Sequence, residues 1–104
     1  MRKVQITVKG SISELRSALK SFCQDEGARL SGRADRGENP DFFSLTVLLK
    51  DERGRYKPAG KVSSQKLRYD RALLTFLSKQ ATFTSFVDGF VARLIQQGFS
   101  PRGL

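Results

Sequence analysis

The sequence predicts an α+β fold, in which helices pack on one face of an antiparallel sheet of three to four strands. Residues 42–62 alternate apolar and polar side chains on both sides of a turn that contains glycine, which is typical of a β-hairpin. Residues 3–9 alternate in the same way and predict a half-buried strand. Apolar residues recur at helical spacing in residues 12–23 and 83–95, which predicts two amphipathic helices.

The first helix has clear signals at both of its ends. Ser11 and Glu14 have the spacing of a capping box, so the helix is expected to begin directly after Ser11. Gly27 is suited to end it, because glycine readily adopts the left-handed conformation found after helices. Cys23 lies on the apolar stripe, and we interpret it as a small buried side chain rather than a reactive thiol.

The middle of the chain is organised around the hairpin. A short peripheral strand is predicted at residues 28–35 and a polar loop at residues 36–41, while residues 51–54 join the hairpin strands. Pro58 lacks an N–H donor, so we expect the second strand to be an edge strand or a bulged one. A symmetric register gives three cross-strand pairs: Lys50 with Arg55, Leu48 with Lys57, and Ser44 with Lys61.

Two further helices are predicted after the hairpin, which gives the order β-α-(β)-β-β-α-α. Ser63 and Ser64 are suited to cap a helix over residues 65–79. The last helix ends near Gly98, and its internal Gly89 indicates close packing against another element. Its stripe of apolar residues, from Phe83 to Ile95, is expected to pack on the sheet. The alternative is that part of this stripe forms the seam of a homodimer.

The composition favours a single domain, residues 1–104, and excludes several kinds of active site. The chain has no histidine and one cysteine, so by itself it offers neither a histidine general base nor a Cys/His zinc site. Asp35, Glu38 and Asp41 are close in sequence, but acids in a loop with proline and glycine are typical turn residues. We therefore expect no enzymatic activity, no catalytic residue, no metal and no cofactor.

A soluble, cytoplasmic protein is expected from the distribution of apolar residues and cysteine. One cysteine allows no internal disulfide, which fits a reducing compartment. The amino-terminal residues lack the apolar run of a signal peptide, and no window has the roughly 18–20 apolar residues of a membrane span. Basic and apolar residues lie on different elements, which argues against binding to a membrane surface.

The positive charge is the main indication of function. Nineteen basic residues face ten acidic ones, which gives a net charge of +9, and residues 50–71 alone hold eight basic and three acidic residues, a net charge of +5. Such a domain favours DNA or RNA as a partner, contacted at the phosphate backbone with little sequence specificity. The residues predicted to make this contact, on the hairpin and the outward sheet face, are Lys50, Arg53, Arg55, Lys57, Lys61, Lys66, Arg68, Lys3, Lys9 and Arg33.

The alternative is a regulatory module that binds an acidic protein through the same surface and has no catalytic activity. Charged residues on the solvent side of strands also protect sheet edges from aggregation, so a solvated face is a further interpretation. Phe42 and Tyr69 are the outward aromatic candidates for base stacking, and we expect both to be partly buried. The sequence signatures of RNA-recognition folds, zinc fingers and helix-turn-helix domains are absent.

Overall fold

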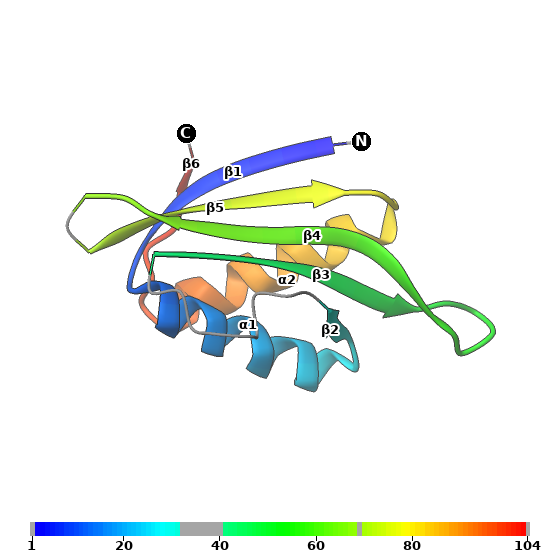
Figure 1. The fold of residues 1–104 in the computed structure, drawn as a ribbon. Helices are drawn as coiled ribbons and strands as arrows, with labels where there is room; N and C mark the ends of the chain where they lie inside the picture. The colour runs from blue at the N-terminus through cyan, green and yellow to red at the C-terminus, as the bar shows by residue number, and fades with distance from the viewer. Residues whose placement is uncertain (1, 32–40, 69, 104) are drawn as a thin grey trace.

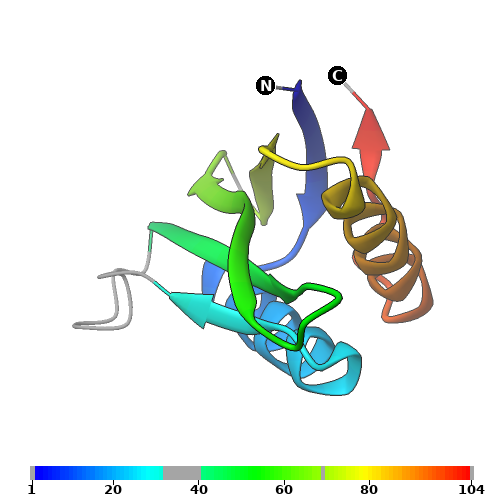
Figure 2. The same cartoon turned by 90° about the vertical axis from the view of Figure 1, so that its right-hand side faces the viewer.

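A computed structural model describes residues 2–31, 41–68 and 70–103 of the chain. Over these residues the protein has two layers, an antiparallel sheet and two helices that cover one of its faces (Figures 1 and 2). The elements are β1 (Arg2–Lys9), α1 (Ile12–Glu26), β2 (Arg29–Ser31), β3 (Phe42–Lys50), β4 (Tyr56–Lys66), β5 (Arg71–Ser78), α2 (Thr82–Gln96) and β6 (Arg102–Gly103). The strands lie in the order β2-β3-β4-β5-β1-β6. The predicted α+β class is confirmed, with six strands in the described residues rather than three to four.

Helix α1 begins and ends where the sequence predicted. The Ser11 hydroxyl accepts a hydrogen bond from the Glu14 N–H at 3.1 Å. At the other end, Gly27 has φ 70° and the Ala28 N–H donates to the Cys23 carbonyl at 2.8 Å. Cys23 is buried, and burial raises the pKa of its thiol to about 12. The thiol is therefore protonated at neutral pH, as the interpretation of Cys23 as a core side chain requires.

Helix α2 is also confirmed, and its apolar stripe packs inside the chain. Phe83 and Phe90 are fully buried, and the Phe86 ring lies 5.1 Å from the ring of Phe22 in α1. A Cβ atom on Gly89 would lie 3.0 Å from the Phe22 ring, which confirms the predicted close packing. Ile95 is 62 % exposed. A homodimer interface on α2 stays a prediction, although most residues of the apolar stripe proposed for it are buried in the core of the chain.

The predicted helix at residues 65–79 is wrong. Residues 65–66 end β4, and residues 71–78 form β5 between β4 and β1. The segment has apolar residues on both faces, so its short pattern fits a helix as well as a strand. Residues 71–78 form a strand because pairing with β4 and β1 gives hydrogen-bond partners to the backbone N–H and C=O groups on both sides of β5. Ser63 and Ser64, expected to cap the helix, lie inside β4.

The β3–β4 hairpin forms where predicted, but its register differs. The loop spans residues 51–55, so Lys50 opposes Tyr56 and the predicted pair of like charges does not form. A β-bulge between Val47 and Leu48 adds one residue to the β4 side. The resulting cross-strand pairs include Leu48 with Pro58, Leu49 with Lys57, Thr46 with Lys61, and Ser44 with Ser63. All three predicted pairs are therefore wrong.

Strand β4 is a central strand with a bulge, and the bulge determines which face each of its basic residues occupies. β4 lies between β3 and β5, so the expectation of an edge strand is wrong and the alternative of a bulged strand is correct. Because the bulge reverses the alternation, Lys57 shares a face with Leu49, and Lys61 shares the opposite face with Thr46. Strand β2 lies at the edge of the sheet, as expected, while residues 32–40 lie outside the described part of the chain.

Candidate nucleic-acid interface

The sheet face opposite the helices is mostly uncharged. Cross-strand neighbours share a face, so the register gives three rows across β3, β4, β5 and β1. These rows are Thr46, Lys61, Leu77 and Lys3; then Ser44, Ser63, Thr75 and Gln5; then Phe42, Gln65, Leu73 and Thr7. Of the residues predicted to bind nucleic acid, the rows contain only Lys3 and Lys61. The other predicted residues that the structure describes lie at the two ends of the sheet.

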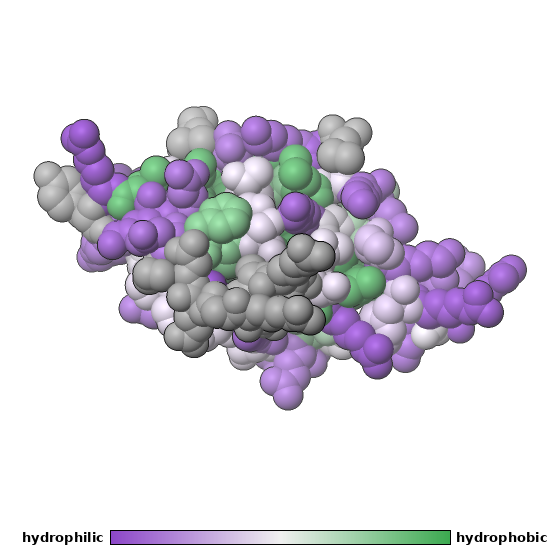
Figure 3. Space-filling view, in the orientation of Figure 1, coloured by the Kyte–Doolittle hydropathy of each residue, from purple (hydrophilic) through white to green (hydrophobic). Residues whose placement is uncertain are grey.

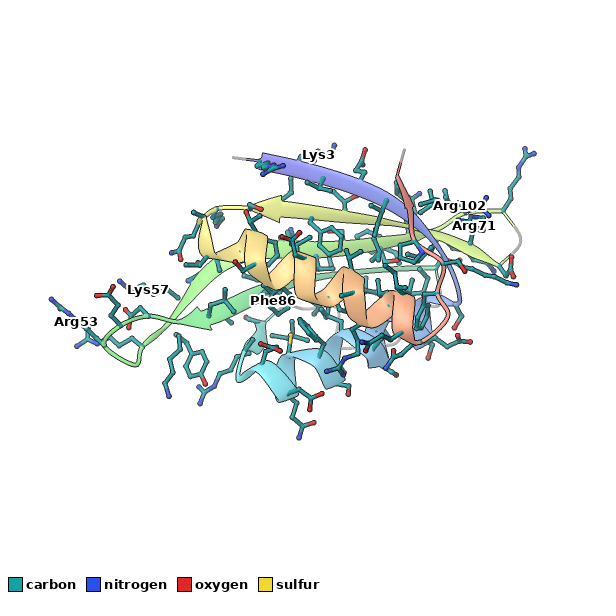
Figure 4. All side chains as sticks on the ribbon, turned by 180° about the vertical axis from the view of Figure 1, so that it is seen from behind. Lys3, Arg53, Lys57, Arg71, Phe86 and Arg102 are labelled. Atoms are coloured by element: carbon teal, nitrogen blue, oxygen red, sulfur yellow. The ribbon has the colours of Figure 1, made fainter. Side chains whose placement is uncertain are left out.

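One end is the β3–β4 hairpin, which projects beyond the other strands (Figure 1). Its basic residues are exposed, and Figure 4 shows Arg53 and Lys57 at its tip. Arg29 joins them from β2, where its guanidinium carbon lies 4.2 Å from the centroid of the Tyr56 ring. We name this group the hairpin cluster: Arg29, Lys50, Arg53, Arg55 and Lys57.

Asp51 holds the hairpin loop in shape. Its Oδ1 atom accepts hydrogen bonds from the backbone N–H groups of Arg53 and Arg55, each at 2.9 Å. Its Oδ2 atom lies 3.4 Å from Lys57 Nζ. The hydrogen bond from the Arg55 N–H is the main cause that lowers the pKa of Asp51, with further contributions from Arg53 and Lys57. An ionised carboxylate therefore holds the loop that carries Arg53 and Arg55, and it also lies close to the Lys57 ammonium group.

Asp51→Asn is expected to loosen this loop and to remove its response to acid. The pKa of Asp51 in the folded protein lies below the ordinary value of 3.8. Asp51 therefore stabilises the loop fully above pH 3.8, and this stabilisation is lost as the pH falls through the folded pKa. Amide hydrogen exchange of Gly54 and Arg55 measures this. Relative to the intrinsic exchange rate at each pH, the wild-type amides should be strongly protected at pH 6 and less protected in acid, whereas those of the variant should be weakly protected throughout. Glu52→Gln removes the neighbouring charge and is the control; identical exchange in Asp51→Asn and wild type would contradict the role of Asp51.

The other end of the sheet carries a second basic group around the β4–β5 turn. Lys9 opposes Arg71 on β1 and β5, and the Arg71 guanidinium donates to Thr7 Oγ1 at 3.1 Å. Two acids lie close to this group, because Lys9 and Lys66 each have a carboxylate oxygen at 3.9 Å, from Asp70 and Asp41 respectively. We name this group the turn cluster: Lys9, Lys66, Arg68, Arg71 and Arg102.

The structure thus divides the predicted site between three places. Four of its residues lie in the hairpin cluster, three in the turn cluster, and Lys3 and Lys61 on the face between them, while Arg33 lies outside the described residues. Figure 3 shows hydrophilic residues gathered at both ends, over the hairpin and over the β4–β5 turn. Sequence reasoning missed Arg71, which it placed on a helix, and Arg102, which reaches the sheet through the two-residue strand β6 (Figure 4).

Phe42 is partly buried, as the sequence predicted, but much of it stays exposed. It lies on the helix-free face and is 43 % exposed, whereas the adjacent Phe43 is fully buried in the core. Tyr69, the other aromatic candidate, lies outside the described residues. Tyr56 was not expected to take part, yet its ring lies beside Arg29 and its hydroxyl donates to the Gly27 carbonyl at 3.1 Å. Through these contacts it connects the hairpin to β2 and α1.

The described residues contain neither a cluster of metal-ligating side chains nor a helix that could span a membrane. Nowhere in residues 2–31, 41–68 and 70–103 do three or more potential metal-ligating side chains gather. Asp35 and Glu38 of the acidic loop lie outside these ranges. Neither α1 nor α2 is long and apolar enough to cross a membrane.

Comparison with known proteins gives no family. The sequence matches none of the protein-family models and none of the curated proteins searched.

Proposed function

We propose that the protein binds DNA or RNA by placing the hairpin cluster against the phosphate backbone, with little sequence specificity. The observation that carries the proposal is the projecting hairpin itself, which presents four exposed basic side chains on eight consecutive residues, Lys50 to Lys57. Together with Arg29, the cluster has five cations against two acids, Asp51 and Glu52, a net charge of +3. A phosphate chain complements this surface and releases counterions on binding.

The shape of the hairpin fits a groove of a nucleic acid. Two paired strands are about 5 Å apart, and the major groove of B-form DNA is about 12 Å wide, so a two-stranded ribbon can enter it. Arg53 and Arg55 lie at the tip, where long cationic side chains reach phosphates on either side of a groove. Contacts of this kind position a protein on the backbone but do not read bases, which favours low sequence specificity.

The turn cluster supplies a second electrostatic contact in this proposal. It lies at the opposite end of the sheet from the hairpin (Figure 4), and Lys3 and Lys61 on the face between them continue the positive potential. Two of its cations are already paired with Asp41 and Asp70. We therefore assign the leading role to the hairpin cluster and a supporting role to the turn cluster.

Fluorescence anisotropy with labelled single- and double-stranded oligonucleotides tests the proposed function. If the hairpin neutralises about three to four phosphates, the affinity for a duplex should fall roughly 40- to 150-fold between about 50 and 200 mM salt. The logarithm of the affinity should decrease linearly with the logarithm of the salt concentration. Absence of binding to either form at about 50 mM salt, or binding that does not respond to salt, would contradict the proposal.

A further inference from the structure

An apolar patch interrupts the helix-free face beside the turn cluster. Phe42 is 43 % exposed and Leu67 is 38 % exposed. The register places Phe42 and Leu73 on either side of Gln65, on neighbouring strands of the same face. Leu67 is two residues after Gln65, and its N–H donates to the Arg71 carbonyl at 2.9 Å, so it continues this face into the turn. Phe42, Leu67 and Leu73 therefore form one patch, beside a shallow hollow lined by Gln65, Lys66 and Arg68.

The exposed ring is not required by the core. Phe43 is fully buried, and the alternation of β3 then turns Phe42 to the face without helices. Leaving a large aromatic ring on an open sheet face favours aggregation and loses the free energy of burial. A ligand that covers the ring would recover this free energy.

The surroundings of the patch indicate the chemistry of such a ligand. Lys66, Arg68 and Arg71 lie at its border and favour a polyanion, although Asp41 also lies there and pairs with Lys66 at 3.9 Å. The next row of the face is uncharged: Ser44 and Ser63 share a hydrogen bond at 3.1 Å, and the Gln5 side-chain amide donates to Thr75 Oγ1 at 3.2 Å. A shared hydrogen bond between two hydroxyls uses one of their two protons, so the other can be donated to a ligand.

We infer that Phe42 is a stacking platform for an unpaired base of a single-stranded nucleic acid whose phosphates lie against the turn cluster. The inference rests on the proposed function and makes it more specific. An aromatic ring, adjacent cations and neutral hydrogen-bonding groups are the parts from which single-strand binding surfaces are built. A duplex keeps its bases stacked inside, so it can use the cations of this surface but not the ring.

Phe42→Ala tests the inference by its effect on the two strand forms. A stacked base contributes about 1–3 kcal/mol, so the variant should bind a single-stranded oligonucleotide roughly 5- to 150-fold more weakly. Its affinity for a duplex of the same length should be unchanged, and so should the salt dependence, because no charge is lost. Ile95→Ala is the matched control, since it removes an exposed apolar side chain from α2 in the other layer, and it should bind both forms like the wild type.

Phe42→Trp gives a second readout that does not depend on affinity. The chain has no tryptophan, so the new indole is the only one, and stacking against a base should quench its fluorescence. Quenching by the single strand and not by the duplex is the expected result.

Equal single-strand affinities of Phe42→Ala and wild type, with an unquenched indole in Phe42→Trp, would overturn the inference and leave the proposed function standing. A wild-type protein that binds neither form at low salt would overturn the proposed function and this inference with it.

Discussion

Replacing Gly60 by alanine is expected to lower the free energy of unfolding by about 2–3 kcal/mol. A Cβ atom at this position would lie closer to the Phe83 ring than van der Waals contact allows, 2.6 Å from its Cγ atom. Phe83 is fully buried at the start of α2, where its ring stacks on that of Phe86 with 5.4 Å between the centroids. A loss of this size is a large fraction of the 5–15 kcal/mol that stabilises a typical domain. Urea unfolding followed by far-UV circular dichroism measures it.

The contact with Phe83 explains why β4 has a glycine beside its bulge. The carbonyl of the bulged Ala59 accepts hydrogen bonds from the N–H groups of Lys79 and Gln80, at 2.9 and 3.1 Å, which fixes the connection from β5 to α2. The first turn of α2 then lies directly on Gly60. Gly103→Ala is the matched control, because nothing lies within 4 Å of the added atom. A Gly60→Ala variant as stable as Gly103→Ala would show that the contact does not constrain the fold.

Replacing both Arg53 and Arg55 by glutamate is expected to weaken nucleic-acid binding on the order of 100-fold at about 100 mM salt. Each contact between a charged side chain and a phosphate contributes about 1.5 kcal/mol or more, and two such contacts are removed and replaced by repulsion. The fold should persist, because both side chains are exposed and the loop is held by backbone N–H groups that the substitution keeps.

The double variant Lys20→Glu/Lys79→Glu is the control for total charge. Both lysines are exposed and lie outside the hairpin and turn clusters, and the change in net charge is the same. This control should lose little affinity if binding is localised at the hairpin. An equal loss in the two double variants would indicate that only the overall charge of the protein matters.

The sequence predicted the elements whose signals are local. The capping box at Ser11 and Glu14 fixes the start of α1, and the recurrence of phenylalanine in α2 has one clear period. Strand β5 was missed for a physical reason. Leu73 and Leu77 occupy its open face while Leu74 and Phe76 occupy the core face, so no polar side marks the period of two. Only the pairing with β1 and β4, which are distant in sequence, identifies it as a strand.

The arrangement of the site depends on the same distant contacts. The bulge lies beside Gly60, where β4 contacts α2, and it places Lys57 and Lys61 on opposite faces, although residues four apart in a regular strand share a face. Arg102 joins the turn cluster only because β6 pairs with β1. The basic hairpin tip was predictable, since it needs only a turn and its neighbours. The separation of the turn cluster from the hairpin cluster by a mostly uncharged sheet face was not predictable.

Contact between the hairpin and phosphates is tested by the salt dependence of duplex binding in the wild type and in the Arg53→Glu/Arg55→Glu variant. Each lost phosphate contact reduces the slope of log affinity against log salt by about one. The slope of the hairpin variant should be shallower by about two, and the Lys20→Glu/Lys79→Glu slope should equal that of the wild type. A slope in the hairpin variant equal to that of the wild type would contradict the claim.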